Sequence, residues 1–303
     1  MIRFFYESVV RAKERNRSYW KLLYKVNKLI LNLIYPIIQK KKCGTGISED
    51  GPVIVSLTTY PGRIDQVWKT ISSLLNQTLK PKRVILWLAK EQFPDQQLPE
   101  SVQRLTGRGL EICYCEDLKS HKKYFEAMKQ FPQEIIVTAD DDILYPENHL
   151  EKLWKTHLEF PQGVICQWSH RIAFDGQGEF LPYNDWPDNG RGAPSLATLA
   201  VGCSGILYPP GAVVKEAFEQ EKLKKYALAA DDLWLKCMEL LAGTKTVNCN
   251  QTILVYYNIL STRKSGLWVS NTGQQKNNDK VWRMLMEQYP EALQCLQKEA
   301  EQE

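Results

Sequence analysis

From residue 52 onward, short apolar runs alternate with stretches that have helical spacing. Runs rich in β-branched residues predict strands, and an apolar residue every three or four positions predicts a helix. Strands are expected at 53–57, 83–88, 110–114 and 134–138, and helices at 65–76, 122–130 and 147–157. Strands separated by helices predict an α/β fold with a mostly parallel sheet flanked by helices. In such sheets, ligands bind at the carboxyl ends of the strands.

The N-terminal 42 residues predict an amphipathic helical arm. They hold eleven Lys and Arg against Glu7 and Glu14, a net charge of +9, whereas the other 261 residues carry −5. Apolar residues recur with helical spacing at Trp20, Leu23, Val26, Ile30, Leu33 and Ile37. Such a stripe bordered by Lys and Arg is typical of a helix in a lipid interface, so an anionic membrane surface is an expected partner. The same pattern suits a helix packed on the protein's own body or on a second subunit.

Segment boundaries and compartment follow from the same composition. The glycine-rich link at 44–51 separates an arm and linker (1–50) from a main domain (51–262), which a largely helical C-terminal tail (263–303) follows. The most apolar stretch, Leu29–Ile38, contains Asn32 and Pro36 and is shorter than the ~20 residues of a membrane span. The eight cysteines lack CxxC spacing, which favours a reducing compartment. We expect a cytoplasmic protein, peripheral at the inner face of the plasma membrane, with no nucleic-acid partner.

Three adjacent carboxylates, Asp140, Asp141 and Asp142, follow the strand expected at 134–138. Like charges at this density repel, and raised carboxyl pKa values or a bound cation must relieve the repulsion. Mg²⁺ and Mn²⁺ accept carboxylate oxygens and keep further positions for phosphate, so Mn or Mg is the expected cofactor. The alternative is an acidic turn that caps the following helix.

A second acidic pair and a glycine segment lie further along the chain. Asp231 and Asp232 precede an apolar helix, where Asp231 suits the N-cap while Asp232 faces a cleft. Gly202, Ser204 and Gly205 belong to a Gly-Cys-Ser-Gly segment that allows close backbone approach to a ligand. The same segment also suits a plain bulge.

The order of these segments is typical of one enzyme class. Val53–Tyr60, Asp140–Asp142, Gly202–Gly205 and Asp231–Trp234 occur with the spacing found in nucleotide-sugar glycosyltransferases. Over about residues 52–260 the chain resembles family 2 glycosyltransferases with the GT-A fold, especially bacterial members that build capsule or lipopolysaccharide glycans. The resemblance implies inverting transfer of a sugar from a nucleotide diphosphate to a glycan or lipid-linked acceptor.

The resemblance also implies residue roles. Asp140 and Asp142 look like the outer carboxylates of the family's DXD motif, which hold ribose and the diphosphate-bound metal, with Asp141 beside the donor. Asp232 matches the family's catalytic base, and Asp231 stands where the family has Glu. Thr58 and Tyr60 would border the nucleoside; the nucleotide base stays open, because the second strand ends without the acidic residue that often reads it.

Cations and aromatic residues complete the expected site. Arg63, Lys122 and Lys123 are candidates for the diphosphate, although lysines here also suit the protein surface. The segment at 170–200 predicts a long structured loop, and its aromatic faces could stack on acceptor sugars or pack beneath the loop. The acceptor candidates are Trp168, Arg171, Tyr183 and Trp186, with His170 and Asp185 nearby. His121 and His149 are expected on solvated surfaces.

Two other classes share parts of this pattern. A sugar-phosphate nucleotidyltransferase also uses paired carboxylates on an α/β sheet, but its first strand usually leads into a glycine-rich basic loop. Here the residues at 58–63 contain one glycine. A non-catalytic glycan-binding or assembly protein would not need two separated acidic pairs.

Overall fold

A seven-stranded sheet forms the centre of the protein. The computed structural model describes residues 1–15, 17–39, 44–250, 256–260 and 277–301. The sheet has the order β10-β5-β9-β4-β1-β2-β3, and its neighbours are parallel except at β9, which is antiparallel to β4 and β5. Its strands are β1 (Ile54–Thr58), β2 (Arg83–Ala89), β3 (Leu110–Cys115), β4 (Ile136–Ala139), β5 (Val164–Cys166), β9 (Ile206–Tyr208) and β10 (Thr246–Asn248). The α/β class with a mostly parallel sheet is confirmed.

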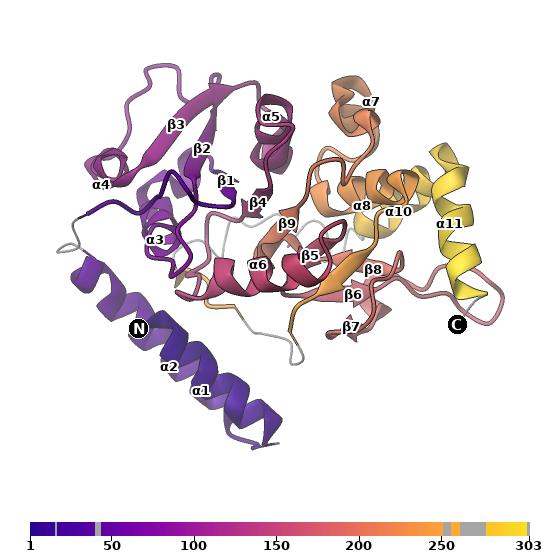
Figure 1. Ribbon diagram of the computed structural model, residues 1–303, viewed down its shortest axis with the longest axis horizontal. Coiled ribbons are helices and arrows are strands. Elements are labelled where there is room, and N and C mark those ends of the chain that lie inside the picture. Colours follow the sequence, from indigo (N-terminus) through magenta and orange to yellow (C-terminus); the bar gives the residue numbers. More distant parts are fainter. Residues whose placement is uncertain (16, 40–43, 251–255, 261–276, 302–303) are drawn as a thin grey trace.

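Helices cover both faces of this sheet (Figure 1). The helices outside the arm are α3 (Ile64–Leu74), α4 (Glu100–Gln103), α5 (Lys122–Gln130), α6 (His149–Glu159), α7 (Gln220–Tyr226), α8 (Asp231–Ala242), α10 (Asn277–Gln288) and α11 (Pro290–Ala300). Of these, α10 and α11 pack against α8. Alternate residues of β1 point to opposite faces of the sheet. Val55 packs in one apolar cluster with Ile71 of α3, whereas Ile54 packs in another with Ala127 of α5. The sheet is therefore buried on both sides, as its continuous apolar strands require.

The segment at 170–200 differs from its prediction as one long loop. It contributes to a three-stranded antiparallel sheet with the order β7-β6-β8. These strands are β6 (Ser169–Arg171), β7 (Asp188–Asn189) and β8 (Thr198–Ala200). Very short strands separated by Gly, Pro and Asn carry too few residues to show a two-residue period, which explains the wrong prediction.

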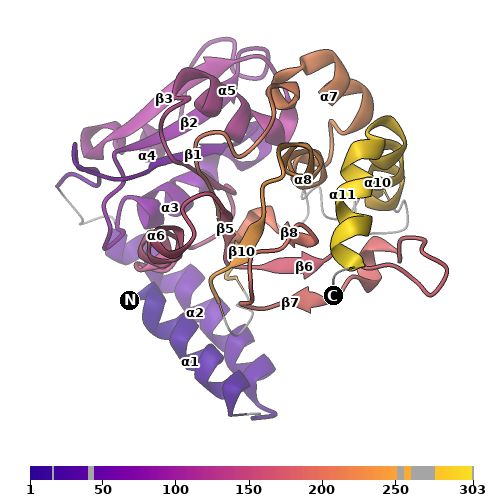
Figure 2. The same cartoon turned by 45° about the vertical axis from the view of Figure 1, so that its right-hand side comes forward.

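The N-terminal arm is a pair of helices, α1 (Ile2–Glu14) and α2 (Trp20–Gln39), which lie side by side at one edge of the molecule (Figure 2). The predicted helical arm is confirmed, and Lys40–Lys42 lie outside the described residues. Tyr6, Leu31 and Tyr35 are buried in the same apolar cluster as β1. No described helix is both long and apolar enough to cross a membrane.

Side chains of the arm also satisfy backbone groups of the main domain. The Tyr6 hydroxyl donates to the Leu144 carbonyl (3.0 Å) and accepts from the Tyr257 amide (2.8 Å). The Asn32 amide donates to the Asn258 carbonyl (3.2 Å), and its oxygen accepts from the Leu260 amide (3.0 Å). The arm therefore supports the backbone that follows Asp142 and the short segment at 256–260.

We predict that Tyr6→Phe destabilises the fold. The variant keeps the ring but leaves two buried backbone groups without a partner, at a cost of about 1–3 kcal/mol. Urea denaturation measures the change in the free energy of unfolding. The control is Tyr19→Phe at an exposed tyrosine of the same arm. Equal stability of the two variants would contradict the supporting role of Tyr6.

Candidate active site

The carboxyl ends of β1 and β4 bring the first acidic segment next to Thr59 and Arg63. Leu57 and Ala139 are register partners, so the chain continues side by side into Thr59 and Asp141. The Thr59 hydroxyl donates to the Asp141 carboxylate (2.6 Å), which also pairs with Arg63. Asp141 is therefore turned into the protein with both carboxylate oxygens engaged.

Asp142 lies beside the same guanidinium at a longer distance. Its carboxylate oxygen is 3.4 Å from Arg63 Nη2. Burial, together with the charges of Asp141 and Asp140, raises the pKa of Asp142 to about 7, although Arg63 acts in the opposite direction. Burial also raises the pKa of Asp141 against the pull of Arg63. One guanidinium thus only partly offsets the repulsion expected from the sequence.

Lys123 joins the first acidic segment to the second. Its ammonium lies 2.7 Å from an Asp140 oxygen and 2.9 Å from an Asp231 oxygen. Burial alone would lower the pKa of this lysine, but Asp140, Asp231 and Asp232 together raise it well above its ordinary value. A charged ammonium is therefore fixed between residues that are about ninety positions apart in the chain.

Asp231 and Asp232 begin α8 in different electrostatic settings. The N-cap is Ala230 and no side chain caps the helix, so capping by Asp231 is not found. Burial opposes ionisation of Asp231, but Lys123 outweighs it and lowers the pKa of this carboxyl. Asp232 accepts the Gly202 amide (2.9 Å), and burial followed by the charge of Asp231 raises its pKa. The pair thus combines a firmly ionised carboxylate with one that can gain and lose a proton near neutral pH.

The glycine segment packs closely against these side chains. A Cβ at Gly202 would lie 2.6 Å from Asp232 Oδ1 and 3.2 Å from Lys123 Nζ. Gly205 has a φ of +72°, and a Cβ there would lie 2.5 Å from His149 Nε2. Ser204 is buried and donates to the Val201 carbonyl (2.8 Å). The segment therefore permits close packing of the catalytic candidates.

Tyr145 is a site residue that the sequence analysis missed. Its hydroxyl accepts the Asp140 amide (2.9 Å) and donates to the Cys203 carbonyl (3.2 Å). It thereby ties the first acidic segment to the glycine segment. No local pattern marks this tyrosine, because both contacts depend on the tertiary fold.

The expectation that His121 and His149 are solvated is wrong. Both side chains are fully buried, and burial lowers their pKa values to about 4 and about 3. His121 contacts the Tyr124 hydroxyl (3.1 Å) and the Ala227 carbonyl (2.9 Å). His149 begins the inner face of α6, against Gly205. These histidines are neutral packing residues at ordinary pH.

The other residues expected to bind the nucleotide sugar lie in different parts of the structure. Tyr60 lies under the Arg63 guanidinium, with 5.7 Å between that group and the ring centroid. The Thr58 hydroxyl donates to the Trp87 carbonyl (2.8 Å). Lys122 is buried and pairs with Asp117 (2.6 Å). The structure therefore brings Lys123 to the acidic segments and directs Lys122 elsewhere.

Among the acceptor candidates, Tyr183 is influenced by the charge of Asp232. Burial, and then the charge of Asp232, raise the pKa of Tyr183. The Trp168 indole donates to Asp188 (2.9 Å), and Arg171 is half-buried on β6. Trp186 is buried against Trp282, with 5.6 Å between the ring centroids. Trp186 is therefore part of the core, in agreement with the alternative that aromatic residues of this segment pack beneath it.

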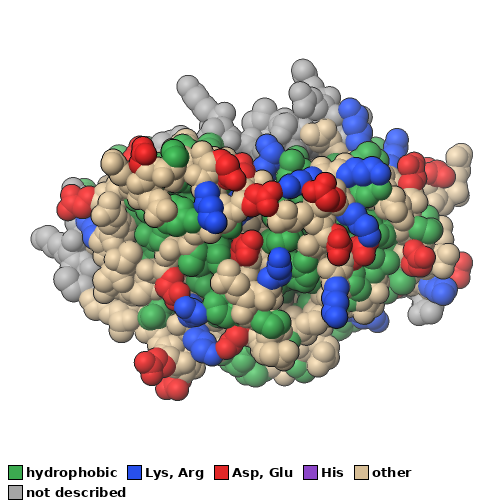
Figure 3. Space-filling view, turned by 90° about the horizontal axis from the view of Figure 1, so that it is seen from above, with side chains coloured by type: hydrophobic (Ala, Val, Ile, Leu, Met, Phe, Trp, Pro, Cys, Tyr) green, Lys and Arg blue, Asp and Glu red, His purple; other side chains and the backbone are tan. Residues whose placement is uncertain are grey.

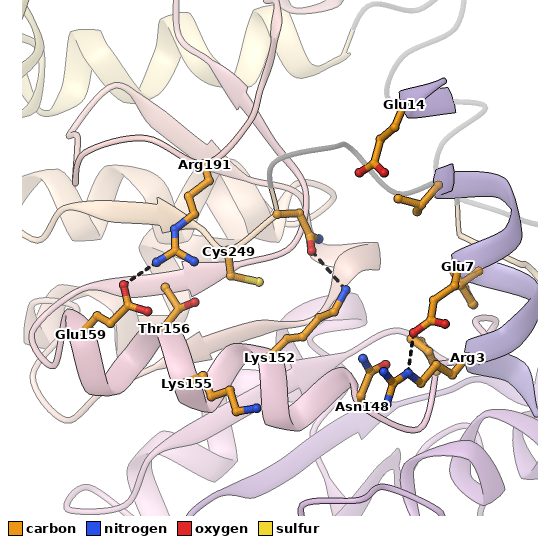
Figure 4. A pocket seen from close by; sticks show the side chains of 14 residues that line it. Arg3, Glu7, Glu14, Asn148, Lys152, Lys155, Thr156, Glu159, Arg191 and Cys249 are labelled. Carbon is orange, nitrogen blue, oxygen red and sulfur yellow. Dashed lines mark hydrogen bonds and ion pairs between the residues drawn. The ribbon is translucent and has the colours of Figure 1, made fainter. Parts of the chain in front are cut away.

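A groove of about 380 Å³ lies away from these residues, between α1, α6 and residues near Asn250 (Figure 4). Its lining includes the ion pairs Arg191–Glu159 and Arg3–Glu7. It contains neither acidic segment.

The end of β4 carries the candidate ligands for the expected metal ion. Within the described residues, no group of three or more His, Cys, Asp or Glu side chains is arranged to hold an ion. Asp140 and Asp142 nevertheless offer two carboxylates at one strand end, and Mg²⁺ is often held by one or two carboxylates plus substrate phosphates. The residues present fit such a shared site.

Comparisons with known proteins were made for sequence and for structure. No family model matches the chain, and no curated protein matches its sequence. A mannosyltransferase from Pyrobaculum calidifontis, solved with GDP-Man and Mn²⁺, is 13% identical over 95% of this chain and 76% of its own, with a TM-score of 0.49. A 4-diphosphocytidyl-2C-methyl-D-erythritol synthase from Anaerococcus prevotii is 15% identical over 73% and 93% (TM-score 0.42). TarS 1–349 from S. aureus is 14% identical over 76% and 68% (TM-score 0.41).

We predict that Asp142→Asn changes how stability depends on pH in metal-free buffer. In the folded protein the pKa of Asp142 is raised to about 7, from an ordinary value of 3.8 for an aspartate side chain. The resulting stabilisation is complete below that ordinary value and is lost as pH rises through about 7. Asn mimics the neutral acid. The free energy of unfolding of the variant, relative to that of the wild type, should therefore rise between pH 4 and 8 by on the order of 1–4 kcal/mol.

Urea denaturation at pH 4 and at pH 8 measures the free energy of unfolding of Asp142→Asn and of the wild type. The control is Asp95→Asn, at an exposed carboxyl. A difference between Asp142→Asn and wild type that stays constant with pH would show that Asp142 is ionised throughout.

Proposed function

We propose that the protein is a metal-dependent, GT-A-like glycosyltransferase that moves a sugar from a nucleotide diphosphate to an acceptor. Residues 51–262 would form the catalytic domain, 1–50 the arm and linker, and 263–303 the tail. The observation that carries the proposal is the position of Lys123 between Asp140 and Asp231. It supports one site in which the two acidic segments act together.

The first acidic segment would hold the donor. Asp140 and Asp142 would bind Mn²⁺ or Mg²⁺, and such an ion offsets the charge of a departing diphosphate. Arg63 and Lys123 supply positive charge beside them, while Asp141 keeps Arg63 in place. Binding a divalent ion would favour the ionised form of Asp142, whose pKa is otherwise raised.

The second acidic segment would activate the acceptor. A hydroxyl becomes a good nucleophile when its proton is removed as the new bond forms. Asp232 would take this proton, because its raised pKa suits a base that works near neutral pH. Asp231, ionised beside Lys123, would hold that ammonium in place. Direct displacement would invert the anomeric configuration of the sugar.

The remaining roles follow the resemblance to family 2 enzymes. Thr58 and Tyr60 would border the nucleoside, and Tyr183, Arg171 and Trp168 would contact a glycan or lipid-linked acceptor. We further propose a role in surface polysaccharide synthesis, with the protein peripheral at the cytoplasmic face of the plasma membrane. The net charge of the arm supports this location.

The base assignment predicts different effects for two neighbouring substitutions. Asp232→Asn should keep nucleotide-sugar binding but lower kcat by about 10²–10⁴, the range for a lost general base. Asp231→Asn should lower kcat less, because Asp231 acts through Lys123. Single-turnover assays with Mn²⁺ measure the rates, and calorimetry measures donor binding. Near-normal turnover by Asp232→Asn would reject the base, and retained anomeric configuration would reject direct displacement.

A further inference from the structure

The outer side of α2 carries a continuous apolar stripe that nothing in the described structure covers. Its members recur with helical spacing and are all exposed: Leu22, Val26, Leu29, Ile30, Leu33 and Ile37. Leu33 and Ile37 are 63% and 68% exposed. Contiguous apolar surface of this kind on a folded protein indicates an interaction site.

Exposed basic residues lie along one border of this stripe and near one end of it. Lys21 and Lys25 lie along one border of it, and Arg11, Arg15 and Arg17 lie around the turn between α1 and α2. The face that carries α5 and α7 differs, because acidic and basic side chains are interspersed there (Figure 3). A second copy of this chain would bring an arm with the same net charge of +9 against the first, and the two arms would repel. An anionic lipid surface would complement both the charge and the apolar stripe.

We propose that α2 is a docking helix that lies flat on an anionic bilayer, with Leu22, Leu33 and Ile37 in the boundary between headgroups and acyl chains. The helix lies on the membrane and does not cross it, since no described helix suits a span. Lys21 and Lys25 would reach headgroup phosphates from the polar border of the stripe.

The opposite side of the same helix borders the candidate active site. Lys28 is buried there. Asn32 holds the backbone of Asn258 and Leu260, on either side of Ile259, whose amide donates to the Asp142 carbonyl (2.8 Å). A helix with its side chains is about 10–12 Å across. Docking through α2 would therefore separate Asp142 from the lipid by about one helix diameter together with the segment at 256–260.

This distance suits an acceptor carried on a lipid anchor, a consequence that rests on the proposed function. The glycan to be extended would enter from the headgroup region beside α2, while a soluble donor would arrive from the water side. The docking surface itself does not depend on catalysis, so the two claims can fail separately.

Co-sedimentation with vesicles tests the docking surface. The full-length protein should bind vesicles of phosphatidylglycerol and phosphatidylcholine more tightly than pure phosphatidylcholine. Raising the salt should weaken binding, because the Debye length falls from about 30 Å at 0.01 M to about 8 Å at 0.15 M. Leu33→Asp should lower the partition coefficient at least about tenfold. The matched control is Leu158→Asp on α6, since Leu158 is also 63% exposed.

Three results would overturn the docking surface. They are absence of vesicle binding at low salt, equal loss of binding in both Asp variants, and a dimer in light scattering that Leu33→Asp dissociates. For the lipid-anchor consequence, an acceptor glycan that supports turnover is presented free and on a phospholipid anchor in vesicles. Leu33→Asp should slow transfer only to the anchored form; an equal effect on both forms would overturn that consequence.

Discussion

The buried ammonium of Lys123 is the contact on which the two halves of the site depend. Asp140 reaches it from the end of β4 and Asp231 from the start of α8. Removing one partner from a buried ion pair leaves an uncompensated charge, which commonly costs about 3–5 kcal/mol. The backbone at Lys123 is itself fixed, because the Ser56 hydroxyl of β1 donates to its carbonyl. Lys123 of α5 thus contacts the end of β4 and the start of α8 through its ammonium, and β1 through its carbonyl.

The same contact separates the roles of neighbouring carboxylates. Asp231 faces Lys123 and stays ionised, while Asp232 faces the Gly202 amide and holds a proton more readily. In the first segment both carboxylate oxygens of Asp141 are engaged by Thr59 and Arg63, whereas Asp140 pairs with Lys123 and Asp142 lies at a longer distance from Arg63. Two runs of acidic residues thereby yield carboxylates with distinct electrostatic properties, although their side chains are chemically identical.

Local patterns in the sequence predicted the elements that carry the site. The helix at 122–130 matches α5, and the predicted strand at 83–88 differs from β2 by one residue, because continuous apolar runs and 3.6-residue spacing are local properties. Placing Asp140–Asp142 at a strand end followed from the same reasoning. Other outcomes depended on the tertiary fold. Lys122 and Lys123 are adjacent, yet they point about 100° apart on α5, toward Asp117 and Asp140.

The contacts of the arm likewise depend on the tertiary fold. Its apolar spacing predicted α2, but the sequence could not divide the apolar positions between the core and the surface. Leu31 and Tyr35 pack on the body, whereas Leu33 and Ile37 are exposed. That division depends on α1 and on the segment at 256–260, which contact one side of α2 through Asn27 and Asn32. Tyr145 and His149 likewise gain their partners only when distant parts of the chain meet.

The central claim is that the first acidic segment, through Asp140 and Asp142, holds a nucleotide-sugar donor together with a divalent cation. A thermal-shift series with nucleotide sugars, nucleoside diphosphates and nucleoside triphosphates, each with Mn²⁺ or with chelator, tests it most directly. Ligand binding stabilises the folded state by mass action, by about 2.7 kcal/mol at a hundred times Kd. We expect one nucleotide sugar to raise the Tm of the wild type with Mn²⁺, and the rise to vanish in chelator and in Asp142→Asn. A shift that persists in both, or no shift with any nucleotide sugar, would contradict the account.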